Sequence, residues 1–128
     1  LLMEKYAAMQ AEACAECWNT DDAELVVVAF GSMARIARSA IRKLREEGLK
    51  AGLFRPKTLY PFPADALRAL APGRRFLVIE QNTGQMVEDV RLSLMGENAK
   101  VDWHGVMPGL VIGADALEDP IRQACKEN

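Results

Sequence analysis

The sequence predicts an α/β protein, a three-layer α/β/α arrangement with a mostly parallel sheet. Two short apolar runs, 25–30 and 75–80, have the composition of strands that are covered on both faces. An amphipathic helical pattern follows each run within a few residues. Strands that alternate with helices in this way form a parallel sheet between two helix layers, with right-handed crossovers.

The leading segment, 1–20, is predicted to be a helix and linker ahead of a folded domain at 21–128. Good helix formers dominate from Leu2 to Trp18. Apolar residues recur there at steps of three or four, which is the spacing of one helical face. They are Leu2, Tyr6, Met9, Ala13 and Cys17. A polar break at 19–22 then leads into the first predicted strand, 24–30.

The helix after this strand has the clearest pattern in the chain. Gly31 permits a tight turn, Ser32 is expected to cap the helix, and Gly48 suits its end. Its apolar stripe comprises Met33, Ile36, Ala37, Ala40, Ile41 and Leu44. A second stripe comprises Arg35, Arg38, Arg42 and Arg45. We favour a solvated face for these arginines over a subunit contact.

The remaining elements continue the alternation. Residues 50–55 predict a strand that Pro56 ends, and Pro63 opens a short helix that closes before Pro72. The strand 75–80 precedes a helix at about 85–94. Its inward residues are Met86, Val87, Val90 and Leu94. A short strand at 99–103, a loop at 105–113 and a last helix from Asp119 to Cys125 complete the expectation.

Composition narrows the class of protein. The 128 residues suffice for one domain, which buries roughly two thirds of its unfolded surface. The formal charge is −2, without the clustered basic surface that nucleic acid requires, so we expect no nucleic-acid partner. The longest apolar run is far below the roughly 20 residues of a membrane span, and no signal peptide opens the chain. We therefore expect a cytoplasmic protein without a membrane partner. Because Leu1 stands where an initiator would, we also expect a fragment of a longer polypeptide.

A strand-end crevice is the candidate binding site. In such sheets ligands bind at the carboxyl ends of the strands, where helix N-termini offer unpaired N–H groups. The candidate residues for an anion site or an interface there are Gly31, Ser32, Arg55, Glu80, Asn82, Gly84 and Gln85. We favour ordinary structural roles for them, as turn, caps and ion pairs. For Glu80 we favour an ion pair with Arg55 or Arg35 over a general base. No dinucleotide or nucleotide-triphosphate fingerprint is present.

The cysteines and the histidine do not predict a metal centre or a catalytic pair. Cys14 and Cys17 form a close pair, but a cluster or a structural zinc needs about four ligands, and Cys125 and His104 are distant in sequence. We expect reduced thiols and no metal bound by this chain. His104 has no neighbouring nucleophile motif, so a packed or surface imidazole is favoured over a catalytic base. No catalytic residue is predicted.

Three segments carry a family resemblance. They are 30–40, 54–63 and 79–86, in that order along the chain. Together they resemble the α subunit of thiamine-diphosphate-dependent 2-oxoacid:ferredoxin oxidoreductases, in the part built like the C-terminal domain of transketolase. The resemblance runs from about Asp21 to Leu94. After Asp102 the sequence departs from the family pattern, which leaves any interface role of the 104–109 loop open.

The resemblance implies a fragment of an enzyme that oxidatively decarboxylates a 2-oxoacid to an acyl-CoA. The full enzyme would use thiamine diphosphate, Mg²⁺ and iron–sulfur clusters, together with coenzyme A, ferredoxin, the rest of the α subunit, and β, γ or δ subunits. This chain matches only a structural or subunit-contact domain, which would bind no cofactor and be inactive alone. The 84–91 run looks most like the 2-oxoisovalerate enzymes, with the 2-oxoglutarate enzymes next. A free-standing small-anion-binding α/β module is the alternative.

Overall fold

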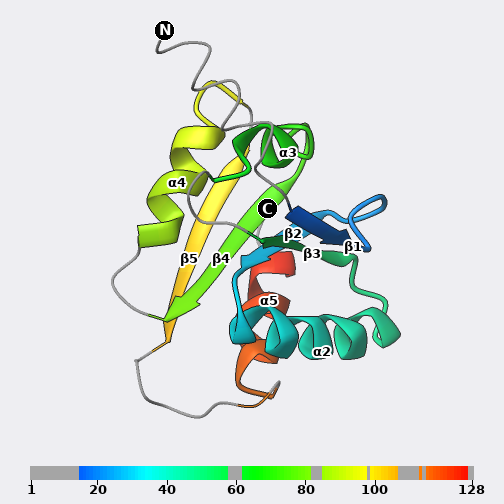
Figure 1. Cartoon of the computed structure of the whole chain (residues 1–128). Helices are drawn as coiled ribbons and strands as arrows, with labels where there is room; N and C mark the ends of the chain where they lie inside the picture. The colour runs from blue at the N-terminus through cyan, green and yellow to red at the C-terminus, as the bar shows by residue number, and fades with distance from the viewer. Residues whose placement is uncertain are drawn as a thin grey trace, which may run out of the picture.

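A five-stranded sheet with helices on both faces organises the part of the chain that the computed structural model describes (Figure 1). The described residues are 15–57, 62–81, 85–97, 99–106, 113 and 115–126. The strands are β1 (Ala15–Trp18), β2 (Leu25–Ala29), β3 (Ala51–Pro56), β4 (Arg75–Gln81) and β5 (Lys100–Val106). The helices are α2 (Ser32–Glu46), α3 (Ala64–Arg68), α4 (Gln85–Ser93) and α5 (Asp115–Lys126).

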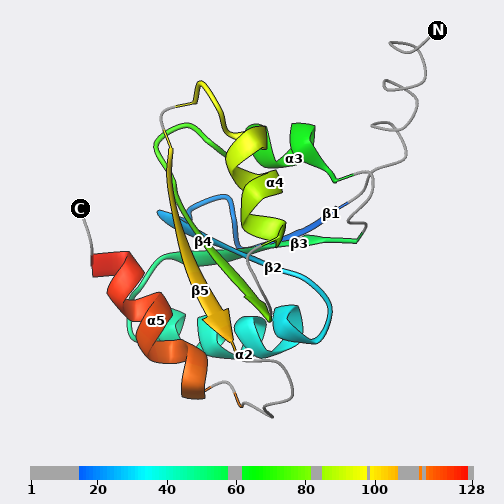
Figure 2. The ribbon, with the colours of Figure 1, turned by 90° about the vertical axis from the view of Figure 1, so that its left-hand side faces the viewer.

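The sheet is parallel except at one edge. Its order is β1-β3-β2-β4-β5, and β1 alone runs antiparallel, against β3. Val27 at the centre of β2 is level with Leu53 on one side and Leu77 on the other. Helices α2 and α5 cover one face, while α3 and α4 cover the opposite face (Figures 1 and 2). The predicted three-layer α/β/α class is confirmed.

Two apolar cores lie on the two faces of the sheet. Alternate strand residues point to opposite faces, so Val27 packs toward α2 and α5 while Val26 and Val28 pack toward α3 and α4. All five residues of β2 are buried. This double burial explains why the predicted strand reads as an unbroken apolar run rather than an alternating one.

The predicted leading helix is wrong for residues 15–18, which form strand β1. Glu16 lies opposite Arg55, and Trp18 lies opposite Leu53. Helix propensity cannot register a long-range pairing of this kind, because the stabilisation comes from the neighbouring strand. Residues 1–14 of that prediction lie outside the described residues. The domain boundary at Asp21 stays a prediction, although the sheet already includes residues before it.

Two further boundaries differ from expectation near the end of the chain. Strand β5 continues through Gly105 and Val106, where a loop was expected, and α5 begins at Asp115 rather than Asp119. Pro120 therefore lies inside α5. Its neighbours Leu117 and Ile121 are fully buried beneath the sheet, and this burial opposes the loss of a helical hydrogen bond at the proline. None of the helices in the described part of the chain is long and apolar enough to cross a membrane.

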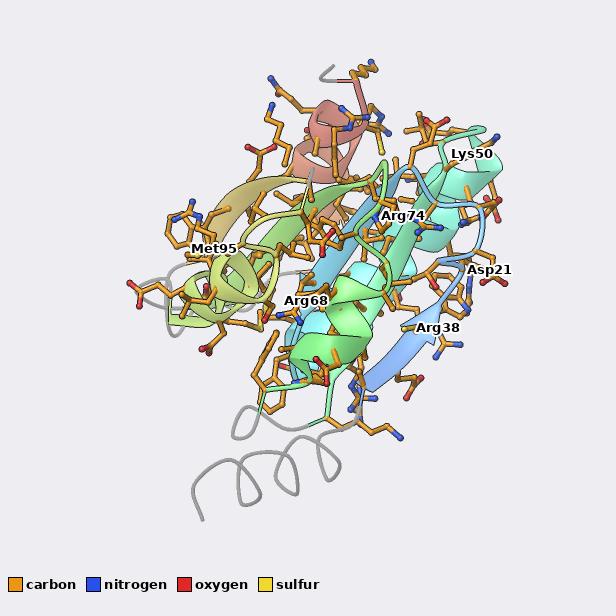
Figure 3. The ribbon with its side chains drawn as sticks, turned by 90° about the horizontal axis from the view of Figure 1, so that it is seen from above. Asp21, Arg38, Lys50, Arg68, Arg74 and Met95 are labelled. Carbon is orange, nitrogen blue, oxygen red and sulfur yellow. The ribbon has the colours of Figure 1, made fainter. Side chains whose placement is uncertain are left out.

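Two arginines clamp the loop that joins β1 to β2. Arg45 donates to the Ala51 carbonyl at 2.7 Å and to the Asn19 carbonyl at 2.7 Å. Arg74 donates to the carbonyls of Ala23 at 3.1 Å, Thr20 at 3.2 Å and Leu70 at 2.9 Å (Figure 3). These bonds satisfy main-chain acceptors at the amino end of the parallel strands. We therefore assign a structural role to the arginines at that end of the sheet.

Candidate functional site

The turn from β2 into α2 keeps the predicted glycine but not the predicted serine cap. Gly31 has φ 66°, a left-handed conformation that favours glycine, and it occupies the N-cap position of α2. Ser32 is exposed and is already the first helical residue, so the cap that we predicted for its side chain is wrong; the N-cap makes no side-chain hydrogen bond. Helix α2 also has no acidic residue in its first turn.

Glu80 is bound inside the fold, and its predicted ion pair with Arg55 or Arg35 is wrong. Its Oε1 accepts the main-chain N–H of Met86 at 3.0 Å, and its Oε2 accepts that of Val87 at 3.0 Å. The indole N–H of Trp103 donates to the same Oε2 at 3.1 Å. Glu80 is buried, so three donors from two other elements converge on a carboxylate away from water. The residue joins β4, β5 and the first turn of α4.

Glu80 occupies part of the α4 N-terminus that the predicted strand-end site would use. Two of the free main-chain N–H groups at this helix N-terminus, those of Met86 and Val87, are bound by Glu80 and are not available to an external anion. Asn82 and Gly84 of the predicted site lie outside the described residues. Gln85 is the first residue of α4, and its side chain also lies outside what the structure describes. The pKa of Asp89 on the same helix is raised by burial and by repulsion from Glu88 and Glu80.

Trp103 reaches Glu80 because the next residue on its face of β5 is a glycine. A Cβ at Gly105 would overlap the six-membered part of the Trp103 ring. Trp103 is 43% exposed, so this residue of the edge strand faces solvent in part while its N–H binds Glu80. Sequence reasoning missed Trp103, although an aromatic residue two positions before a glycine in a strand is a usable signal for such packing.

The second part of the predicted site, Arg55, lies in a different place. Its Nη1 is 3.7 Å from Glu16 Oε2 on the neighbouring edge strand, so its partner is Glu16 and not Glu80. Arg55 lines a small cavity of about 30 Å³ together with Glu16, Trp18 and Leu53 from the sheet. Helix α2 supplies the rest of the lining, Ala34, Arg35 and Arg38. Three guanidinium groups and one carboxylate therefore meet at this pocket, which we call the arginine pocket.

The arginine stripe of α2 divides into separate roles. Arg45 is held by main-chain carbonyls and by Asp22, so the solvated-face prediction is wrong for it. Arg38 lies over the Trp18 ring, 4.9 Å from its centre, as a cation–π contact. Arg42 is exposed, as predicted. Among the described residues Arg35 has no ion-pair partner, although its side chain lines the arginine pocket.

A wider groove runs between β5 and α5. It has a volume of about 460 Å³ and opens to solvent. Its polar lining includes Asp102, His104, Asp119 and Gln123. His104 is thus a surface imidazole, in agreement with the favoured interpretation. The described residues that line this groove include no serine or cysteine that His104 could activate.

The cysteines in the described part of the chain show no sign of reactive or ligating chemistry. Burial raises the pKa of the Cys17 and Cys125 thiols, which opposes the thiolate that acts as nucleophile or ligand. In the described ranges no three His, Cys, Asp or Glu side chains come close enough together to hold a metal ion. Cys14 lies outside those ranges. The described residues therefore do not fit an iron–sulfur cluster or a metal centre.

The described residues form an α/β domain whose fold occurs in two solved structures. A split-gene transketolase, solved as an inactive β4 tetramer, matches 88% of this chain with a TM-score of 0.67 at 19% identity, over 41% of its own chain. The 2-oxoglutarate:ferredoxin oxidoreductase of Magnetococcus marinus, solved with 2-oxoglutarate, coenzyme A and succinyl-CoA, matches 98% of this chain with a TM-score of 0.75 at 19% identity. The match covers 22% of that chain. At these identities the two structures establish the fold alone.

Sequence comparison places the chain within one family. The model of the pyruvate:ferredoxin oxidoreductase core domain II matches residues 23–114. The ketoisovalerate oxidoreductase subunit VorB of Methanothermobacter thermautotrophicus is 49% identical over 94 residues, which is 72% of this chain and 27% of VorB. The chain belongs to the family of pyruvate:ferredoxin oxidoreductase core domain II, and the predicted resemblance is confirmed. It spans about a quarter of the length of this curated relative.

Proposed function

We propose that this chain is a domain of the α-type subunit of a thiamine-diphosphate-dependent 2-oxoacid:ferredoxin oxidoreductase, an enzyme that converts a 2-oxoacid to an acyl-CoA. The observation that carries the proposal is the 49% identity to VorB, over a segment that is only 27% of VorB. The remaining length leaves room for the domains that would bind cofactors. Within that enzyme the chain acts as a structural and subunit-contact domain.

The geometry of the described residues supports a non-catalytic role. Glu80, the one buried carboxylate at the carboxyl ends of the strands, already accepts three hydrogen bonds from within the fold. These bonds hold Glu80 within the fold, which does not favour a role as general base. Among the described residues, the lining of the groove that holds His104 includes no nucleophile. Thiamine diphosphate, Mg²⁺ and iron–sulfur clusters would bind to other segments or subunits. The isolated chain is expected to be inactive.

The proposed substrate rests on the likeness to VorB. VorB is named for ketoisovalerate, the same compound as 2-oxoisovalerate, so we favour this branched-chain 2-oxoacid. The likeness to the 2-oxoglutarate:ferredoxin oxidoreductase keeps 2-oxoglutarate as the second candidate, although 19% identity argues for fold rather than substrate. Partners in the full enzyme would be the rest of the α subunit, the β, γ or δ subunits, ferredoxin and coenzyme A. We place the full enzyme in the cytoplasm, together with these partners.

The proposal is tested on the native protein. An antibody raised against this chain should detect a polypeptide several-fold heavier than 14.1 kDa in extracts of the source cells. The antigen should copurify with coenzyme-A-dependent reduction of ferredoxin by a 2-oxoacid. Parallel assays with 2-oxoisovalerate, 2-oxoglutarate and pyruvate would rank the substrates. A native polypeptide of 14.1 kDa without such activity would refute the proposal and favour a free-standing anion-binding module.

A further inference from the structure

The arginine pocket holds more positive than negative charge in a partly enclosed space. Arg55 faces Glu16 directly across the antiparallel pair of strands, and their closest charged atoms are 3.7 Å apart. Arg35 and Arg38 enter from α2, one helical turn apart. The single carboxylate therefore serves one of three guanidinium groups.

The other two guanidinium groups are not neutralised within the described part of the chain. Arg38 contacts the face of Trp18, a contact that leaves its N–H donors available around the ring. Arg35 has no carboxylate partner there. Like charges that converge without a counter-charge repel one another, and an anion between them would relieve this repulsion. Arginine is also the side chain best suited to bind two oxygens of one planar anion.

The size of the cavity selects the chemical class of the anion. Its volume is about 30 Å³. One water needs roughly 10–15 Å³ measured in this way, so the pocket admits about two oxygen-sized groups. Nucleotides and coenzymes are far too large. Leu53 and Ala34 give the pocket an apolar side, which suits the carbon that carries a carboxylate.

We propose that the arginine pocket, between β1, β3 and α2, is a binding site for a single carboxylate group. Arg35 and Arg55 hold the two oxygens, and Arg38 is kept in place by Trp18. The carboxylate can belong to a small free acid or to an acidic side chain of a neighbouring segment. The site does not depend on the proposed oxidoreductase activity, because all its residues lie in this chain.

The test is a titration of the 128-residue chain with sodium acetate, compared with sodium chloride at equal ionic strength. The substitution Trp103→Phe leaves Trp18 as the sole tryptophan, since the sequence has two. Trp18 fluorescence then reports on the arginine pocket, because Arg38 lies over its ring. We expect a saturable change with acetate and none with chloride. A thermal midpoint that rises with acetate concentration should accompany it.

Matched variants separate binding from general charge effects. Arg35→Gln should weaken acetate binding at least tenfold, whereas Arg42→Gln, on the same helix but exposed outside the pocket, should not change it. Glu16→Gln should strengthen binding several-fold, because it removes the carboxylate that repels acetate. A purely structural role for Glu16 predicts no such gain. Equal responses to acetate and chloride, or equal losses in Arg35→Gln and Arg42→Gln, would overturn the proposal.

The same titration on a longer native polypeptide that contains this chain identifies the source of the carboxylate. If the acetate response persists there, the ligand is a free carboxylate. If the response is absent in the longer protein and present in the 128-residue chain, an acidic side chain of the remainder occupies the pocket.

Discussion

The substitution Glu80→Gln tests whether the buried carboxylate holds β4, β5 and α4 together. Glutamine has nearly the same shape but replaces one acceptor oxygen with an NH₂ group. One of the two main-chain N–H groups, Met86 or Val87, would then face another donor. The substitution also removes the negative charge from the N-terminus of α4, where the helix dipole favours it.

The expected loss of stability is large for a substitution that nearly preserves the shape of the side chain. A hydrogen bond to a charged group contributes about 1.5–3 kcal/mol, and the dipole interaction adds about 0.3–1 kcal/mol. Because one oxygen remains as an acceptor, we expect Glu80→Gln to lower the free energy of unfolding by about 2–4 kcal/mol. For a chain of this size that corresponds to a fall of roughly 10 °C in the thermal midpoint.

The assay is urea unfolding of the purified chain, followed by circular dichroism. The matched control is Glu88→Gln, which makes the same chemical change at an exposed position of the same helix. Trp103→Phe keeps an aromatic ring but removes the third donor, so its effect should couple to that of Glu80→Gln in a double-mutant cycle. A Glu80→Gln chain within about 0.5 kcal/mol of the wild type would refute the reasoning, since surface substitutions commonly fall in that range.

Three further predictions concern the amino end of the sheet. Gly52→Ala should destabilise the fold by about 1–3 kcal/mol in urea unfolding, because its Cβ would lie 2.6 Å from the Asn19 carbonyl oxygen; Gly113→Ala, whose Cβ meets nothing within 4 Å, is the neutral control. Arg74→Met should cost about 2–4 kcal/mol in the same assay because it leaves main-chain carbonyls without their donor, whereas the exposed Arg42→Met should be nearly silent. The hydrogen bond from Arg45 lowers the pKa of Asp22 below its ordinary value of 3.8. The ion pair between Asp22 and Arg45 therefore stabilises the fold at pH values above 3.8. This stabilisation is lost as the pH falls through the lower pKa of folded Asp22. Urea midpoints measured across this pH range should therefore fall less steeply for Asp22→Asn than for the wild type.

The patterns that predicted the fold correctly are those in which local sequence and tertiary environment agree. The run at 25–29 is apolar because both faces of β2 are covered, so its composition alone identifies a central strand. Helix α2 combines a glycine turn, a regular apolar stripe and a glycine shortly after its end. In both elements the signal and its cause lie within the same few residues.

The predictions that were wrong depend on residues far apart in the sequence. Strand β1 is stabilised by its pairing with β3, some forty positions away, while its own residues favour a helix about equally well. Glu80 was assigned to the wrong partner because arginine is the commonest partner of a carboxylate. The usable signal was different: an acidic residue ends an apolar strand shortly before a helix begins, which is where a carboxylate can bind the free N–H groups of that helix.

The arginine pocket also depends on residues far apart in the sequence. Arg55 was predicted as an anion or interface residue, and Arg35 and Arg38 lie on the exposed stripe of α2 that the sequence predicted. Their convergence becomes visible only when β1 is placed at the edge of the sheet, because Trp18 and Glu16 complete the wall of the arginine pocket. By contrast, Arg45 is held by Asp22 and main-chain carbonyls, and Glu80 accepts three hydrogen bonds. Three arginines and one glutamate line the pocket beside β1, which the sequence predicted to be part of a helix and linker, and we expect this edge of the sheet to receive an acidic group.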